Sequence, residues 1–183
     1  PSLQISQIAL TNTTTVQLTL SQPLQPGIIY RLLPFTGIDC LGNPALSMDT
    51  VLFGLVVPAV AGDLLINEIL FNPRVGGSRF IEIINASQKF INLSTIAIGR
   101  INATHHDIYP TGVNEIIAPG EIAVFTPSPS DILSKYTVPK PEKLYSAIVP
   151  TWDDKSDHAA ILASGEIIDS FTYSSTWHHP VIS

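Results

Sequence analysis

Proline and glycine divide this chain into short segments that are rich in isoleucine, valine, leucine, threonine and aromatic residues. The 183 residues include 15 Pro and 11 Gly. Inside the segments, apolar and polar residues alternate with a period of two more often than apolar residues recur every 3.6 positions. Val16, Leu18 and Leu20, for example, alternate with polar residues, as in a half-buried antiparallel strand. The pattern predicts an all-β fold.

Turn-forming residues separate the predicted strands into two groups. The first 61 residues supply about four strands, including 16–21, 28–35 and 50–57, and leave no room for a helix between them. Residues 58–62 are small or uncharged and mark a domain boundary. Further strands are predicted at 64–71, 79–85, 90–101, 121–126, 159–162 and 167–173, with one helical turn at 130–136 capped by Ser130. We predict two β domains, residues 1–61 and residues 62–183.

The charge composition disfavours binding to nucleic acid or to anionic lipid. Nine Lys and Arg against fifteen Asp and Glu give a formal net charge of -6. The cations form no cluster, and attraction to a polyanion needs clustered cations. Charged residues make up only 13 % of the chain, compared with about 25 % in an average soluble domain. A surface with so few charges favours contacts through polar uncharged and apolar groups.

The single cysteine, Cys40, has no partner for an internal disulfide, so we expect a buried free thiol and a fold held by packing alone. An oxidising compartment is compatible with this composition. No run approaches the roughly 18 apolar residues of a membrane-spanning helix. The sequence begins at Pro1 without a signal peptide, which we interpret as a piece of a longer protein.

Five short motifs in the second predicted domain resemble the lamin tail domain of the bacterial type. In chain order they are LINEIL at 65–70, FIEIIN at 80–85, INLS at 91–94, APGE at 118–121 and GEIIDSFTY at 165–173, with Trp177 after the last. Thr95 and Ile96 stand where the family typically has Gly and Trp. No single motif is specific, and the resemblance rests on their order and spacing over residues 63–183.

The resemblance implies an immunoglobulin-like β-sandwich that serves as an adhesive or recognition module and has no enzymatic activity. It also implies a secreted or cell-surface bacterial protein. Family members normally continue into a further strand after the region of Trp177, so the predicted sandwich lacks its last strand in this sequence. Residues 1–61 are similar to the latter half of bacterial Ig-like repeats of the surface-layer type, through TVQLTL at 15–20 and GID at 37–39.

Two carboxylates, Glu68 and Glu82, lie inside otherwise apolar predicted strands. Alternation places Glu68 on the side of Ile66 and suggests, as one hypothesis, an acid and base pair. The favoured interpretation is structural: each carboxylate accepts hydrogen bonds from the backbone, or from Arg79 or Arg100, because a buried carboxylate without partners is costly. We therefore predict no catalytic residues and no enzyme.

Metal sites have two weak candidates. Asp153, Asp154 and Asp157, next to His158, form an oxygen-rich loop of the kind that Ca²⁺ prefers, but the EF-hand spacing is absent and a lysine interrupts the loop. A solvated turn is the favoured interpretation. The pairs His105–His106 and His178–His179 could each give only one ligand to a zinc site, since neighbouring strand residues point to opposite faces. We predict no metal and no cofactor.

The function that follows is a binding or scaffolding module of a secreted or cell-surface bacterial protein, with a protein or cell-envelope ligand and no nucleic acid. The alternative is a carbohydrate-binding accessory module of a secreted hydrolase, in which Trp152, Trp177 or Tyr173 stacks on sugar rings. Exposed edge strands further predict a homodimer. Four N-x-S/T tripeptides match the glycosylation pattern, which we interpret as mostly coincidental.

Overall fold

The structure, a computed structural model, describes residues 3–33, 41–43 and 50–177, with the backbone alone for Trp177. The chain forms two compact units that divide between Leu55 and Val56. The boundary that the sequence suggests, between residues 61 and 62, stays a prediction. Cys40 and the pair His178–His179 lie outside the described residues, so the buried thiol also stays a prediction.

The described part of the first unit consists of two hairpins. β1 (Ile5–Asn12) pairs antiparallel with β2 (Thr15–Leu20), and β3 (Tyr30–Leu32) pairs antiparallel with β4 (Val51–Phe53). The Tyr30 ring stacks on Phe53 with 5.6 Å between the ring centroids. β3 begins later than predicted because Ile28 still belongs to the preceding turn, where its N–H donates to Gln25 O.

One sheet of the second unit has the strand order β12-β11-β6-β5. Its strands are β5 (Leu64–Leu70), β6 (Phe80–Asn85), β11 (Ile122–Thr126) and β12 (Leu144–Ser146). β6 pairs antiparallel with both β5 and β11, whereas β11 and β12 are parallel. β5 and β12 are therefore the edge strands of this sheet.

The other sheet has the strand order β14-β13-β8-β9. Its strands are β8 (Ile96–Ile101), β9 (His106–Pro110), β13 (Ser156–Ala163) and β14 (Glu166–Ser174), all paired antiparallel. A short ladder joins β7 (Ile91–Asn92) to β10 (Ile116–Ile117). β14 and β9 are the edge strands here, and β14 packs next to β5 of the other sheet.

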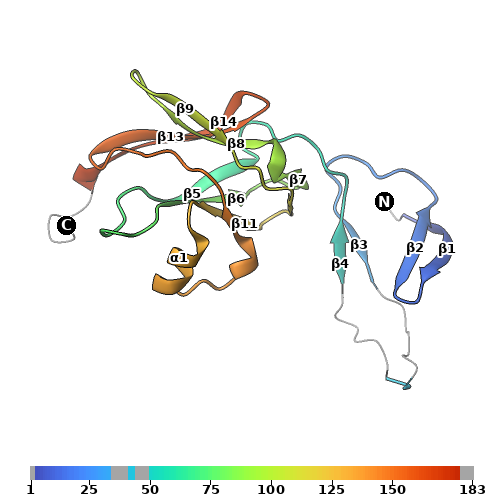
Figure 1. Cartoon of the computed structure of the whole chain (residues 1–183). Helices are drawn as coiled ribbons and strands as arrows, with labels where there is room; N and C mark the ends of the chain where they lie inside the picture. The colour runs from blue at the N-terminus through green and yellow to red at the C-terminus, as the bar shows by residue number, and fades with distance from the viewer. Residues whose placement is uncertain (1–2, 34–40, 44–49, 178–183) are drawn as a thin grey trace. The chain divides into compact units, whose positions relative to one another are not determined.

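The two sheets face each other across one hydrophobic core (Figure 1). Alternate residues of the strands point into it, as the period-two pattern requires. Ile81 and Ile83 of β6 and Ile98 of β8 are 0 % exposed, and Trp152 from the loop before β13 is 2 % exposed. The all-β, immunoglobulin-like sandwich that the sequence predicts is thus confirmed.

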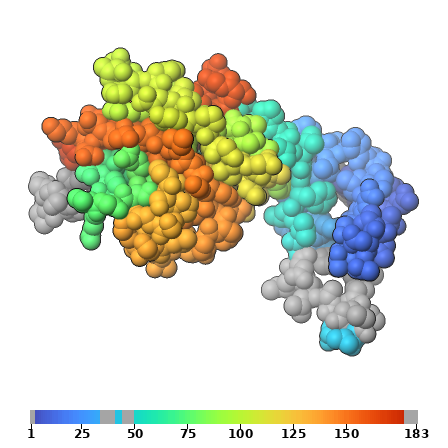
Figure 2. All heavy atoms as spheres, viewed as in Figure 1, coloured from blue at the N-terminus to red at the C-terminus, as the bar shows by residue number. Residues whose placement is uncertain are grey.

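The helical segment α1 (Pro129–Lys135) lies against the sandwich on the opposite side from β9 (Figures 1 and 2). It begins earlier than predicted, with Ser128 rather than Ser130 at the N-cap position and Pro129 in the first turn, where its missing N–H costs nothing. Two short 3-10 turns, η2 (Pro141–Lys143) and η3 (Ser175–Trp177), complete this unit. Among the described residues, no helix is long and apolar enough to span a lipid bilayer.

The single strand predicted at 90–101 is wrong, because a 3-10 turn, η1 (Leu93–Thr95), interrupts it between β7 and β8. The Asn92 side chain starts this turn by accepting a hydrogen bond from Ser94 N–H at 2.9 Å. A polar side chain that bonds to the backbone two residues ahead competes with the strand ladder at that point.

The same local bond recurs at every N-x-S/T tripeptide of the chain. In each one the asparagine Oδ1 accepts the backbone N–H two residues later, at 2.9 to 3.1 Å, as in an Asx turn. The four pairs are Asn12 with Thr14, Asn85 with Ser87, Asn92 with Ser94 and Asn102 with Thr104. Each tripeptide thus forms a local turn, and the interpretation that the glycosylation pattern is matched mostly by chance stays a prediction.

A β-bulge at Asn67 changes the direction in which the side chains of β5 point. Ile66 pairs with Ile83 of β6 before the bulge, and Glu68 pairs with Glu82 after it. Because Asn67 is one extra residue, the alternation is reversed beyond it. Ile66 packs against the core, whereas Glu68 lies exposed beside Glu82 on the outer face of the sheet.

Candidate functional site

Glu68 and Glu82 are neighbours across β5 and β6, but not in the arrangement that the sequence suggests. The bulge separates Glu68 from the side of Ile66, so that part of the prediction is wrong. Glu82 accepts a hydrogen bond from Asn67 Nδ2 at 2.6 Å. Neither of the predicted arginine partners is used. Arg79 donates to Thr151 Oγ1, and Arg100 pairs with Asp157.

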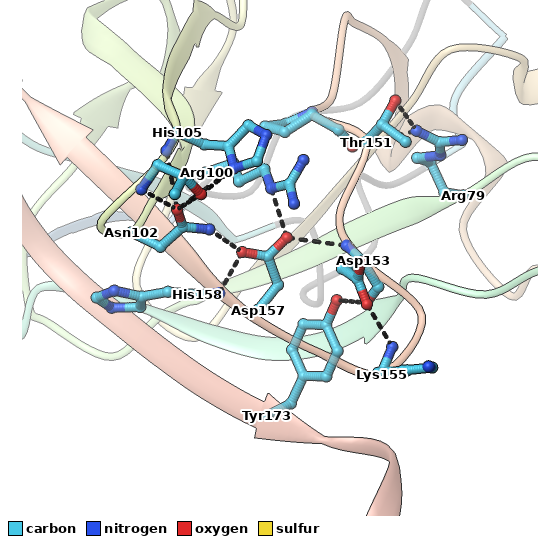
Figure 3. A network of polar contacts seen from close by, with 12 residues as sticks. Arg79, Arg100, Asn102, His105, Thr151, Asp153, Lys155, Asp157, His158 and Tyr173 are labelled. Atoms are coloured by element: carbon cyan, nitrogen blue, oxygen red, sulfur yellow. Dashed lines mark hydrogen bonds and ion pairs between the residues drawn. The ribbon is translucent and has the colours of Figure 1, made fainter.

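Asp157, at the start of β13, is the centre of a buried polar network (Figure 3). Its side chain is 0 % exposed. Oδ1 accepts hydrogen bonds from Asn102 Nδ2 at 2.7 Å and from His158 N–H at 2.8 Å. Oδ2 accepts a bond from Asp153 N–H at 2.8 Å and lies 2.5 Å from Arg100 Nε, in an ion pair whose N–H is not aligned as a hydrogen bond.

These contacts set the ionisation of the network. Burial by itself raises the pKa of Asp157, but the Asp153 and His158 N–H groups, the Asn102 amide and Arg100 together lower it below its ordinary value. Burial also raises the pKa of Tyr173, which stays protonated and donates its O–H to Asp153 O. The network thus fixes the loop before β13 to β8 and β14.

The oxygen-rich loop does not converge on a common point. Asp157 is held by the network, Asp153 Oδ1 accepts Lys155 N–H at 2.8 Å, and Asp154 is exposed. Across the described residues, no group of three or more His, Cys, Asp or Glu side chains is placed to hold a metal ion. The prediction of a solvated turn is wrong for Asp157, whose side chain is buried in an ion pair with Arg100. The neighbouring residues in the sequence give no sign of this distant partner.

The histidines behave differently from one another. His105 Nδ1 lies 2.9 Å from Thr104 Oγ1 within the turn that Asn102 forms. His106 is exposed and begins β9. The two side chains therefore contribute to a turn and to a surface strand.

The aromatic residues considered for sugar stacking are buried where the structure describes their side chains. Trp152 is 2 % exposed and Tyr173 is 3 % exposed. Phe71 covers the Tyr173 ring, with 4.1 Å between centroids and an interplanar angle of 18°. These two rings are parts of the core, so the prediction that they offer a flat sugar-binding face is wrong.

A groove of about 300 Å³ lies between the edge strands β5 and β14. Asn67, Glu68 and Ile69 of β5 form one wall, while Phe171 and Ser174 of β14 lie on the other. The stacked rings of Phe71 and Tyr173 also line it. Phe171 is 38 % exposed, so a bound group could cover a substantial apolar surface.

Two hydrogen bonds close one end of this groove. Gly62 N–H donates to Ile168 O at 3.1 Å, and Ile66 N–H donates to Asp169 Oδ2 at 2.7 Å. Both bonds join the start of the β5 segment to β14. The groove begins beside them, with Ile66 as the first residue of β5 in its lining.

The sequence profile of the Lamin Tail Domain family matches residues 58–175. This chain belongs to the lamin tail domain family. The match spans nearly all the described part of the second unit, from before β5 to the end of β14. No curated protein matches the chain.

The lamin tail domain motifs correspond to the elements that build the groove and the core. LINEIL lies in β5, FIEIIN is β6, and the motif at 165–173 lies in the β14 hairpin. Sequence reasoning missed the groove because Phe71 and Phe171 are 100 positions apart. It also missed the pairing of Arg100 with Asp157, for which the sequence offers no local signal.

Proposed function

We propose that the lamin tail domain of this chain is a non-enzymatic module that recognises another polypeptide through the groove between β5 and β14. The observation that carries the proposal is an apolar, aromatic groove bordered by β5 and β14, each of which is the terminal strand of its sheet among the described residues. Adding a strand at such an edge is a common way of binding extended peptides. Membership of a family of immunoglobulin-like modules supports the same role.

The proposed setting is a secreted or cell-surface protein of a bacterial envelope. The low charged fraction of 13 % and the resemblance of residues 1–61 to surface-layer repeats support this setting. The carbohydrate-binding alternative has less support, because Trp152 and Tyr173 are in the core. Dimerisation is a further part of the proposal, since a second copy is one polypeptide that can pair with an edge strand.

A phage-displayed library of random dodecapeptides, selected on the purified full chain, tests the proposal. Enriched peptides should bind the wild type and lose at least tenfold in affinity with Phe171→Thr, which removes an aromatic ring from the groove. Ile167→Thr is the matched control, because Ile167 is on the same strand and is 44 % exposed. Thermal unfolding of both variants checks that each remains folded.

Enrichment of peptides that bind Phe171→Thr as well as they bind the wild type would place recognition elsewhere and overturn the proposal. So would saturable binding in a glycan array with no peptide enriched. Light scattering of the chain over a range of concentrations measures self-association. A Phe171-dependent dimer would identify a second copy as one occupant of the groove.

A further inference from the structure

Glu68 in the groove lining and Glu82 on the neighbouring strand have no ion pair among the described residues, although Glu82 accepts a hydrogen bond from Asn67 Nδ2. Glu68 lines the groove and is exposed, and Glu82 lies directly across from it on β6. The ion pairs of the described residues involve other carboxylates: Asp63, Asp157, Asp131 and Glu121. Like charges placed opposite each other on neighbouring strands are destabilising, so this pair is a site where an added cation lowers the energy.

The alternation of side chains along a strand determines which residues of a bound segment could place a cation beside Glu68 and Glu82. A segment added to the outer edge of β5, the terminal strand of its sheet among the described residues, would point alternate side chains to the two faces of the sheet. On the inner face they would meet the aromatic groove of Phe171 and Tyr173. On the outer face they would meet Glu68 and Glu82, because the bulge at Asn67 turns Glu68 outward.

We infer that the occupant of the groove is an extended polypeptide segment in which apolar residues alternate with Lys or Arg, paired with the edge of β5 beyond Asn67. The apolar residues enter the groove between β5 and β14, and the adjacent cations pair with Glu68 and Glu82. The closed end at Ile66 and Asp169 limits how far the segment can extend along β5. This inference rests on the proposed function and adds the chemistry of the partner to it.

The alternation is a requirement of the geometry and does not follow from charge alone. In a strand, neighbouring residues point to opposite faces, so a cation and an apolar residue must be adjacent to reach the two sites. A peptide of the same composition with its cations grouped together cannot satisfy both. Backbone pairing also requires free N–H groups on the peptide, which N-methylation removes.

Four fluorescein-labelled peptides test the inference against the full chain by fluorescence polarisation at low ionic strength. The probe is Thr-Lys-Leu-Lys-Leu-Lys-Thr, with blocked ends. The comparison peptides are its neutral form with Gln for each Lys, the rearranged form Thr-Lys-Lys-Leu-Leu-Lys-Thr, and the probe N-methylated at both Leu residues. We expect the probe to bind about five- to tenfold more tightly than the neutral form, since exposed charge pairs contribute up to about 1 kcal/mol each. The rearranged and N-methylated peptides should bind more weakly than the probe.

Variants of the protein test whether Glu68 and Glu82 are the carboxylates that pair with the cations of the peptide. The double variant Glu68→Gln with Glu82→Gln should bind the probe and the neutral peptide equally, and 0.5 M NaCl should reduce the difference in the wild type because salt screens exposed charges. Glu166→Gln is the matched control, since it removes one exposed carboxylate at the other end of β14. Ser174→Trp, which fills the groove from the opposite wall without removing a ring, should weaken all the peptides that bind.

The outcomes separate this inference from the proposed function. Equal binding of the probe, the neutral form and the rearranged form, all weakened by Phe171→Thr or Ser174→Trp, overturns the inference and leaves the groove as a peptide site. A preference for the probe that persists in the double glutamine variant also overturns it. Absence of binding by every peptide, or binding that neither groove variant changes, counts against both.

Discussion

Asp157→Asn tests the buried network that holds the loop before β13. The substitution keeps the shape of the side chain but replaces one acceptor oxygen with an NH₂ donor. If the amide oxygen stays near Asn102 and His158, the NH₂ group faces the donors of Asp153 and Arg100. Rotating the amide only exchanges the two pairs of donors, so two favourable contacts are lost in either orientation.

The expected cost follows from these contacts. A hydrogen bond to a charged group contributes about 1.5 kcal/mol at the low end, so two lost contacts cost about 3 kcal/mol. Breaking a buried ion pair costs about 3 to 5 kcal/mol. The Arg100 side chain is 14 % exposed, so water partly solvates the remaining cation and the lower end of that range applies.

Equilibrium urea unfolding of the full chain measures this cost. Both tryptophans, Trp152 and Trp177, belong to the second unit, so their fluorescence reports its unfolding. With a urea m-value of about 2 kcal/mol/M, Asp157→Asn should lower the midpoint by about 1.5 M without changing m. Asp154→Asn, which removes an exposed carboxylate from the same loop, should change the unfolding free energy by less than about 0.5 kcal/mol. Equal costs for the two variants would refute the role assigned to the network.

Three further predictions concern the second unit. Folding lowers the pKa of Asp157, so its ionised form stabilises the folded state fully above about pH 4, and this contribution is lost as the pH falls through the folded-state pKa. The difference in unfolding free energy between the wild type and Asp157→Asn should therefore shrink below pH 4. A constant difference down to pH 2 would contradict the lowered pKa. Asn85→Ala should cost about 2 to 4 kcal/mol in urea unfolding, because the 0 % exposed Asn85 amide donates to two backbone carbonyls, whereas the same change at the exposed Asn114 should cost less than about 0.5 kcal/mol. Trp152→Ala should cost about 3 to 5 kcal/mol of unfolding free energy by opening a core cavity. Trp152→Phe should cost less than about 1.5 kcal/mol, since the indole Nε1 has no acceptor among the described residues. Comparable losses for the two variants would mean that the indole makes a bond essential to the fold.

Local patterns in the sequence were enough to predict the sandwich. Alternation of period two and turn residues act over a few positions, so they predicted β5, β6, β11 and β14 to within one residue at each end. The order of the lamin tail domain motifs predicted the family, which the match over residues 58–175 confirms. The Asx turns of the four N-x-S/T tripeptides are also local features, but we did not predict them from the sequence.

What the sequence by itself determined is therefore which segments are strands and which family they form. Only the tertiary structure decided the direction of Glu68, the burial of Trp152, the ion pair between Arg100 and Asp157, and the groove. The physical reason is sequence distance. A bulge depends on the register with a neighbouring strand, and the bond that closes the groove joins Ile66 to Asp169, 103 positions apart. Contacts of this kind depend on how the sheets pack, which no short segment of sequence specifies.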